Sequence, residues 1–287
     1  MLQIARLSPK QLGDSAALVE GFLRSQLHPN GGFINRSGDS DIYYTVFGLE
    51  GLIALGAAIP EKTASYLREF GNGAGLDLIH LCCLIRCWAS VCGVAAIPLD
   101  YEAVTKRLES FRIRGGGYNT QLDTDEATAY GSFMVAAAYQ DLRLEIPDAE
   151  GLVRSLKRLR AEDGGYSNQP EQDMGLTPST AAAATLLRQL GEEIPADVAP
   201  WLLARCRDEG GFFAGPFAPI PDLLSTATAL HALSGLKASI EAIKEPCLDF
   251  VDSLWTNTGA FYGNWMDDAA DCEYTYYGLL ALGHLSL

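Results

Sequence analysis

The chain has 287 residues, a hydrophobic content of 48% and a formal net charge of −15. This length allows one large domain or two, and the negative charge argues against nucleic acid as a partner, because phosphate binding needs clustered Lys and Arg. No apolar run approaches the roughly 20 residues of a membrane span, and the N-terminus lacks the basic-then-apolar order of a secretory signal. Seven cysteines without any CxxC spacing are typical of core residues in a reducing compartment. We therefore expect a cytoplasmic protein with no membrane span.

The first predicted helix covers residues 15 to 27, where the apolar side chains of Ala17, Leu18, Phe22 and Leu23 have helical spacing. It is followed by a Gly-Gly-Phe turn. The next predicted helix begins near Asp41, whose carboxylate can cap free backbone N–H groups, and it ends at Gly56.

The same pattern then recurs about every 40 to 50 residues, a period typical of helical-hairpin repeats. Each unit has a Gly-Gly-aromatic turn, a polar loop and a helix that starts near a threonine. The turns begin at Gly31, Gly116, Gly164, Gly210 and Gly259 (as Gly-Ala-Phe), with threonines at 45, 128, 180, 226 and 275. A degenerate unit begins at Gly73. Ile-Pro pairs mark the starts of the following helices, because proline suits a first helical turn. The six predicted repeats are approximately 15–58, 59–96, 97–145, 146–193, 194–238 and 239–287.

Two kinds of helix alternate along these repeats. Those after the turns, such as residues 180–190 and 226–236, are small and apolar nearly all round, whereas those after the Ile-Pro pairs carry charges such as Arg154 and Lys157. Helices that are apolar all round are buried, and amphipathic helices face water on one side. We therefore predict a single all-α domain over residues 1–287, with an inner and an outer ring of helices and no substantial sheet.

The repeat of Gly-Gly-aromatic turn, polar loop, Asp-x-x-x-Thr and apolar helix resembles that of protein prenyltransferase β subunits and of squalene or terpene cyclases, over nearly the whole chain. The stretch from Gly31 to Leu49 is especially similar to the last repeat of the prenyltransferase β subunits. The resemblance implies an α/α toroid with six inner and six outer helices, and an aromatic central cavity for an isoprenoid chain. It also implies a separate helical α-type partner subunit.

The zinc ligands implied by the resemblance are incomplete in this sequence. Asp222 stands at the position of the family's Asp, but Leu224 replaces its Cys and Tyr274 replaces its His. Zinc takes four ligands, mainly Cys and His, so a lone Asp does not hold it. When the first repeat is matched with the family's last, the set becomes Asp271 and Glu273 with Tyr44 in place of His, which suits Mg²⁺ better than zinc.

An acidic stretch offers a different chemistry. Asp123-Thr124-Asp125-Glu126 resembles the Asp-x-Asp-Asp motif with which class II terpene cyclases protonate an alkene. A carboxyl group beside other carboxylates keeps its proton, because like charges resist joint ionisation. The match is one position out of register with Thr128, and Glu replaces the last Asp. An acidic loop that caps a helix would have the same composition.

The remaining candidates are expected at the cavity. Arg36 is the clearest basic residue for a diphosphate. Aromatic side chains at helix starts can either pack between helices or line the cavity and stabilise a carbocation. The aromatic candidates are Tyr43, Tyr44, Phe47, Tyr118, Tyr130, Trp265, Tyr274, Tyr276 and Tyr277.

Three functions follow from these residues. The first is transfer of a prenyl group from an isoprenoid diphosphate to an acceptor, with a divalent metal, Mg²⁺ or Zn²⁺. The second is acid-initiated cyclisation of an isoprenoid or polyprene, and the third is non-catalytic binding by the toroid. The candidate catalytic acids at the predicted inner-helix starts are Asp123, Asp125, Glu126, Asp222 and Asp271. Because these acids outnumber the bases there, we expect either a bound cation or a carboxyl with a raised pKa.

Overall fold

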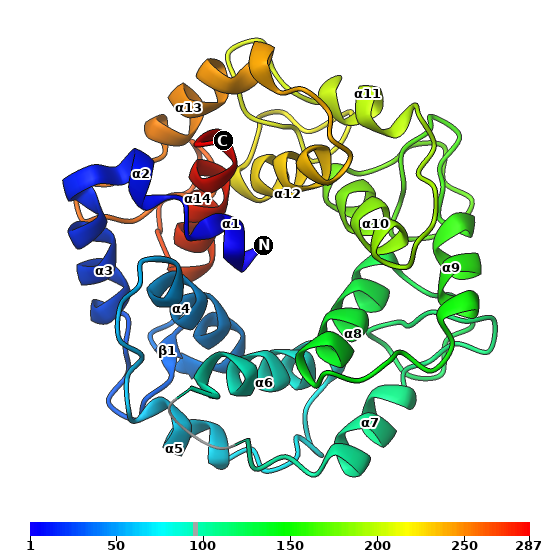
Figure 1. Cartoon of the computed structure of the whole chain (residues 1–287), viewed down its shortest axis with the longest axis horizontal. Coiled ribbons are helices and arrows are strands. Elements are labelled where there is room, and N and C mark those ends of the chain that lie inside the picture. The colour runs from blue at the N-terminus through cyan, green and yellow to red at the C-terminus, as the bar shows by residue number, and fades with distance from the viewer. Residues whose placement is uncertain (94–96) are drawn as a thin grey trace.

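The computed structural model describes residues 1–93 and 97–287, and it shows two concentric rings of helices (Figure 1). The inner ring consists of α4 (Ile42–Ala54), α6 (Leu78–Val91), α8 (Ala129–Asp141), α10 (Thr177–Gln189), α12 (Leu223–Gly235) and α14 (Cys272–Leu285). The outer ring consists of α3 (Ala16–Ser25), α5 (Thr63–Arg68), α7 (Tyr101–Glu109), α9 (Ala149–Arg158), α11 (Val198–Leu203) and α13 (Lys244–Ser253). The predicted toroid of six inner and six outer helices is confirmed.

The ring is closed by contacts between its first and last inner helices. Each inner helix contacts the next one along the chain, and α14 contacts α4. The remaining elements are short: α1 (Leu2–Ala5), α2 (Pro9–Leu12), two 3₁₀ turns at Gly13–Ser15 and Glu241–Ile243, and one antiparallel pair, β1 (Phe33–Ile34) with β2 (Ser40–Asp41). The predicted repeat boundary at residue 96 lies outside the described residues.

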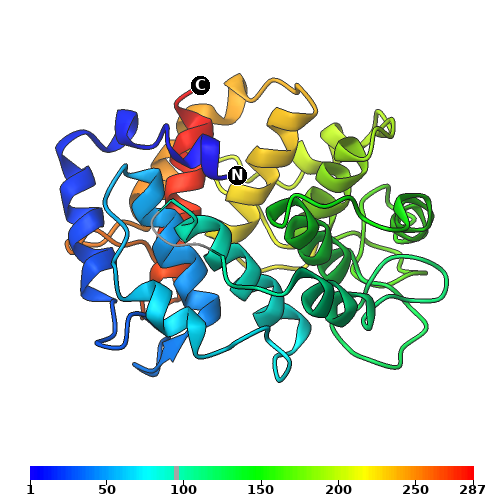
Figure 2. The ribbon, with the colours of Figure 1, turned by 60° about the horizontal axis from the view of Figure 1, so that its bottom comes forward.

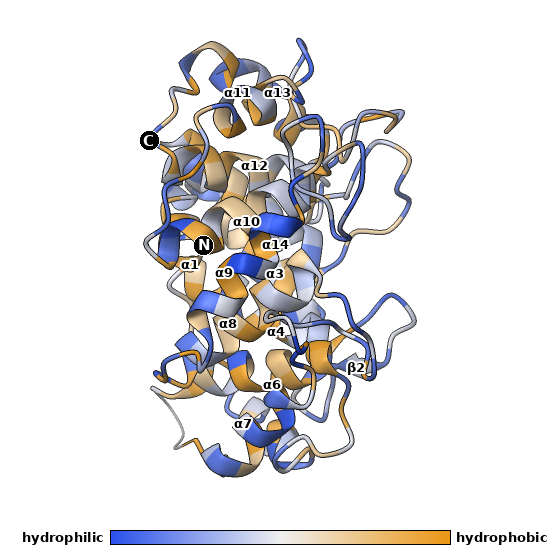
Figure 3. Cartoon of the chain, turned by 90° about the vertical axis from the view of Figure 1, so that its right-hand side faces the viewer, coloured by the Kyte–Doolittle hydropathy of each residue, from blue (hydrophilic) through white to orange (hydrophobic). Residues whose placement is uncertain are grey.

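The inner helices run in the same direction, so the ring has two different ends. The long loops that precede the inner helices lie together on one side, to the right in Figure 3, and both chain termini lie toward the other. Figure 2 shows α1 reaching into the ring beside α14, and these two helices are in contact. We call these sides the loop end and the α1 end. No helix in the described part of the chain is long and apolar enough to cross a membrane.

In five of the repeats, the turn is fixed to the following inner helix by one hydroxyl group. In four repeats a threonine Oγ1 in the first turn of the inner helix accepts a hydrogen bond, at 2.8 to 3.4 Å, from the backbone N–H of the turn's aromatic residue. Ser132 does the same for Tyr118 at 3.1 Å. Thr128 instead caps α8 by accepting from the Gly131 N–H. The predicted equivalence of Thr128 with the other threonines is therefore wrong, because the serine four residues later occupies that position.

Candidate functional site

A cavity of about 310 Å³ lies inside the inner ring, near the lower limit of ordinary ligand pockets. All six inner helices contribute to its walls, which are mostly apolar and aromatic. The inner ring positions these walls because its helices are apolar nearly all round and leave side chains on the inward face. Its lining residues are Met1, Tyr43, Val46, Phe47, Glu50, Cys82, Cys83, Arg86, Tyr130, Phe133, Met134, Ala137, Ala138, Asp141, Pro178, Ala181, Ala182, Thr185, Leu224, Thr228, Tyr276 and Tyr277.

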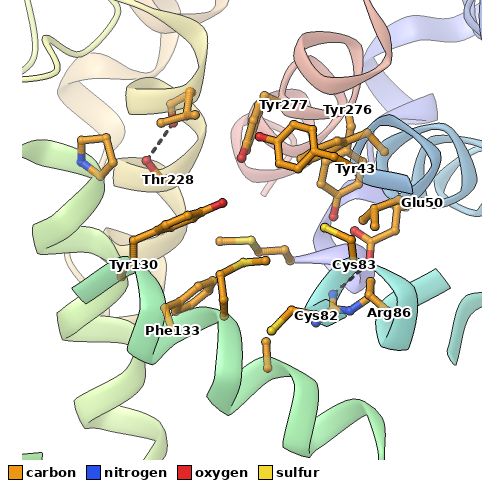
Figure 4. Close-up of a pocket in the computed structure, with 18 of the residues that line it drawn as sticks. Tyr43, Glu50, Cys82, Cys83, Arg86, Tyr130, Phe133, Thr228, Tyr276 and Tyr277 are labelled. Carbon is orange, nitrogen blue, oxygen red and sulfur yellow. Dashed lines mark hydrogen bonds and ion pairs between the residues drawn. The ribbon is translucent and has the colours of Figure 1, made fainter. Parts of the chain in front are cut away.

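A half-buried carboxyl group, that of Glu273, contacts the wall of this cavity at the loop end. The hydroxyl of Tyr43 donates a hydrogen bond of 2.6 Å to Glu273 Oε1, from a side chain that lines the cavity (Figure 4). Burial raises the pKa of Glu273 to about 7, and the charge of Asp271 adds to this, while the Tyr43 hydrogen bond and Arg36 oppose it. Burial also raises the pKa values of Tyr130 and Tyr277, and the charge of Glu273 adds to the rise, in second place for Tyr277 and after Cys83 for Tyr130. With a pKa of about 7, the Glu273 carboxyl is about half protonated at neutral pH.

An ion cluster occupies the α1 end of the same cavity. Arg86 on α6 donates from Nη1 to Glu50 Oε1 on α4 at 2.9 Å and from Nε to Asp141 Oδ2 on α8 at 2.5 Å. Figure 4 shows Arg86 beside Glu50. Burial raises the pKa of Asp141, and Arg86 opposes this rise. Of the described residues that line the cavity, Arg86 has the only cationic side chain, and two carboxylates already neutralise it.

A second ion cluster lies at the loop end, outside the cavity. Arg36 donates to both carboxylate oxygens of Asp267 at 2.8 and 2.9 Å and to Asp271 Oδ2 at 2.7 Å. It also stacks over the ring of Tyr274, 5.6 Å from the ring centroid. A depression of about 510 Å³ borders this cluster and Asp222. The predicted phosphate-binding Arg36 is thus engaged by two carboxylates.

The predicted acids have different positions. The side chains of Asp123, Asp125 and Glu126 are exposed on the loop before α8 and do not line the cavity. Asp222 is partly buried and caps α12, where it accepts from the backbone N–H and the hydroxyl of Ser225, each at 2.7 Å. Asp271 caps α14 in the same way by accepting from the Tyr274 N–H.

The predicted aromatic residues divide into two groups. Tyr43, Phe47, Tyr130, Tyr276 and Tyr277 line the cavity. The other four lie elsewhere: Tyr44 packs edge-on to Tyr43, Tyr118 donates to Glu109 behind the inner ring, Trp265 donates to Ser253 on the outer ring, and Tyr274 packs under Arg36.

Glu50, Arg86 and Asp141 were not predicted as site residues. Glu50 and Arg86 are single charges inside otherwise apolar helices, and a charge in such a helix needs a partner or a function. That signal is present in the sequence. Their mutual distance, however, depends on the packing of helices from three different repeats.

The donor set at the loop end does not fit a zinc ion. Asp271 and Glu273 have separate partners, Arg36 and Tyr43. Within residues 1–93 and 97–287, no three His, Cys, Asp or Glu side chains form a group that could hold a metal ion. Zinc is held by four ligands, mainly Cys and His. Binding of Mg²⁺ by Asp271 and Glu273 together with substrate phosphates remains a prediction.

Comparison with known proteins is consistent with this architecture. The family model for the prenyltransferase alpha-alpha toroid domain matches residues 2–85, 84–196 and 180–286. The chain therefore belongs to the prenyltransferase α/α toroid family. A search of curated protein sequences gives no significant match.

Three solved structures illustrate the range of the fold. A Candida albicans protein geranylgeranyltransferase-I complexed with GGPP matches with a TM-score of 0.68, covering 94% of this chain and 90% of that one. The type II terpene cyclase MstE from Scytonema has a TM-score of 0.63, with 96% and 97% covered. A D-mannose isomerase has a TM-score of 0.66, with 97% and 98% covered. Each is 14% identical to this chain, so the likeness shows the fold alone.

Proposed function

We propose that the protein binds a neutral isoprenoid chain in the central cavity and starts its cyclisation by protonating an alkene, with Glu273 as the acid. The observation that carries this proposal is the half-buried Glu273 carboxyl, which is hydrogen-bonded to Tyr43 in the wall of an aromatic cavity and has a pKa raised to about 7. A general acid must hold a proton near the working pH. The family relationship supports the isoprenoid as the ligand class.

The charges of the site favour a neutral ligand over a diphosphate. Arg86 inside the cavity and Arg36 at the loop end are each paired with two carboxylates. A diphosphate would have to compete with these carboxylates for the guanidinium groups and would meet their negative charge. A hydrocarbon chain instead replaces water against apolar walls, which is favourable.

The proposed reaction adds one proton to the substrate and later removes one, so that the product is an isomer of the substrate. The proton of the Glu273 carboxyl passes to a terminal alkene carbon, and the alkene π electrons form the new C–H bond. The π bond of the next alkene attacks the resulting cation and closes a ring. A carbon beside the final cation then loses a proton to water, which restores an alkene, and Glu273 takes a proton from water. The ring faces of Tyr43, Phe47 and Tyr277 can stabilise the cation on its way.

Incubation with farnesol and with geranylgeraniol, followed by gas chromatography with mass detection, tests this function. The wild-type protein should form a cyclic isomer, and Glu273→Gln should lower the rate by about 100-fold or more, the range of general-acid catalysis. Asp125→Asn is the matched control, because its exposed carboxylate lies away from the cavity. Equal rates in wild type and Glu273→Gln, or loss of product in Asp125→Asn, would overturn the assignment of the acid.

A second candidate is prenyl transfer from a diphosphate, favoured by the depression of about 510 Å³ beside Arg36, Asp222, Asp267 and Tyr274. Mg²⁺ is commonly held by one or two carboxylates together with substrate phosphates. If this function is correct, Mg²⁺ and farnesyl diphosphate together should raise the melting temperature where neither does alone. Asp271→Asn should remove that synergy relative to its own baseline.

A helical partner subunit also remains a prediction, which co-purification would test.

A further inference from the structure

We propose that the α1 end of the cavity is a binding subsite for the hydroxyl group of a prenyl alcohol, formed by Glu50, Arg86, Asp141 and Tyr276. This inference rests on the proposed function, because it specifies the substrate class and its orientation. The four side chains come from α4, α6, α8 and α14, and all of them line the cavity.

The first observation is a buried hydroxyl group that lacks a well-formed hydrogen bond. Tyr276 is 2% exposed, and within the described part of the chain its hydroxyl makes no hydrogen bond of ordinary geometry. Burial, and next the nearby Glu50 carboxylate, raise the pKa of this hydroxyl. Buried polar groups in folded proteins nearly always have a partner, and a poorly satisfied one destabilises the fold. Because Tyr276 lines the cavity together with Glu50, a ligand in the cavity can supply a hydrogen bond of better geometry (Figure 4).

The second observation is the net charge of the cluster. Arg86 brings one positive charge, while Glu50 and Asp141 bring two carboxylates. Met1 also lines the cavity, and burial lowers the pKa of its α-amine, which reduces the positive charge of that group. Arg86 uses Nη1 and Nε for these two partners, and each carboxylate uses one oxygen, so further donor and acceptor positions remain. An excess of acceptor groups favours a ligand that donates a hydrogen bond, such as an O–H group, and disfavours an anion.

The third observation is the separation of the two polar ends. Tyr43 and Glu50 lie seven residues apart on α4, which corresponds to about 10 Å along the helix axis. Between them the walls are apolar, with Val46, Phe47 and Phe133. A prenyl alcohol with its hydroxyl at the α1 end therefore directs the far end of its chain toward Glu273. The subsite determines which alkene receives the proton.

Calorimetric titration with farnesol, farnesyl methyl ether and farnesyl diphosphate tests the subsite. Farnesol should bind about tenfold more tightly than the ether, which lacks the donor, and more tightly than the diphosphate. Tyr276→Phe should bring the farnesol affinity close to that of the ether, while the melting temperature stays the same or rises because a poorly satisfied hydroxyl is removed. Asp141→Asn should also reduce the difference, with the Glu50–Arg86 pair left in place.

Thr228→Val is the matched control within the same cavity. The Thr228 hydroxyl already donates to the Leu224 carbonyl at 2.7 Å, so its removal should not change the ratio of farnesol to ether affinity. Equal affinities for alcohol and ether in the wild type would overturn the subsite and leave isoprenoid binding intact. Tightest binding of the diphosphate, or an unchanged ratio in Tyr276→Phe, would also overturn it. No binding of any of the three ligands would overturn the proposed function itself.

Discussion

Glu273 holds its proton to a higher pH than an ordinary carboxyl because its half-buried side chain lies near Asp271, while the Tyr43 hydroxyl donates a direct hydrogen bond to it. Its pKa rises from 4.5 to about 7 on folding. Between these values the folded protein binds more protons than the unfolded chain, so this group makes stability fall as the pH rises. The same burial that makes Glu273 a usable acid therefore destabilises the fold above neutral pH.

Glu273→Gln should remove this pH dependence and preserve the contact with Tyr43. Between about pH 4.5 and pH 7.5, the wild type should lose on the order of 3 kcal/mol of unfolding free energy that the variant keeps. Urea unfolding at both pH values measures the difference. Glu126→Gln on the exposed loop should follow the wild-type profile. Parallel profiles for wild type and Glu273→Gln would show that Glu273 does not titrate in this range.

A histidine pair imposes the opposite pH dependence. His231 Nδ1 and His284 Nε2 lie 3.1 Å apart between α12 and α14, and burial lowers their pKa values to about 3 and about 4. The unfolded chain binds more protons than the folded protein below about pH 6.5, so this stability is lost as the pH falls. We expect His231→Gln to flatten the acid side of the stability profile. An unchanged acid side in urea unfolding would contradict that expectation.

At the scale of elements, the first glycine of the turn lies against the backbone at the start of the next outer helix in four repeats, at Gly31, Gly116, Gly210 and Gly259. Gly210 has φ of 93°, and a Cβ there would collide with the Pro246 carbonyl of α13. Gly191 has a similar φ of 84° but open space around it. The two positions therefore separate backbone strain from the steric requirement of the turn.

Gly210→Ala should destabilise the protein by about 1 to 3 kcal/mol more than Gly191→Ala. Both variants introduce a side chain at positive φ, so the difference measures the contact between turn and helix. Thermal or urea unfolding of both gives this number. Equal losses in the two variants would mean that the backbone of α13 moves aside and that the close approach is not required.

The sequence predicts these elements well because the turn, the loop and the apolar helix are local patterns that recur in each repeat. The site was predicted only in part. Tyr43, Phe47, Tyr130, Tyr276 and Tyr277 line the cavity as expected, and Glu273 was placed at the loop end but as a metal ligand. In the third repeat, Thr128 was taken as equivalent to the other threonines, and this prediction was wrong because Ser132 occupies that position. Glu50, Arg86 and Asp141 meet only through packing between repeats, which periodicity does not encode.

For the whole molecule, Arg36 connects the first repeat to the last. Its partners Asp267 and Asp271 are more than 230 residues away in sequence, and the Asp271 side chain is only 4% exposed. Tyr43 and Glu273 join the same two repeats. These contacts close the ring next to the cavity. The closure of the toroid and the proposed acid therefore lie in the same contact region between the first and the last repeat.

Arg36→Met should therefore destabilise the protein by about 1 to 3 kcal/mol, because the buried Asp271 loses a charged hydrogen bond while the exposed Arg36 was partly screened by water. Arg154→Ala is the control, since Arg154 and Glu150 form an exposed pair at 3.8 Å whose loss should change stability by less than about 0.5 kcal/mol. Equal stability of the two variants would contradict a structural role for the contacts of Arg36 between the first and the last repeat.

The most direct measurement of the central claim is the reaction of farnesol in D₂O, with the product analysed by mass spectrometry. Protonation by Glu273, which exchanges with solvent, should place one solvent deuterium on carbon in each molecule of the cyclic product. Glu273→Gln should give labelled product at a rate lower by about 100-fold or more, and Asp125→Asn should give as much as the wild type. A cyclic product without carbon-bound deuterium, or equal labelled product from Glu273→Gln, would contradict acid-initiated cyclisation by Glu273.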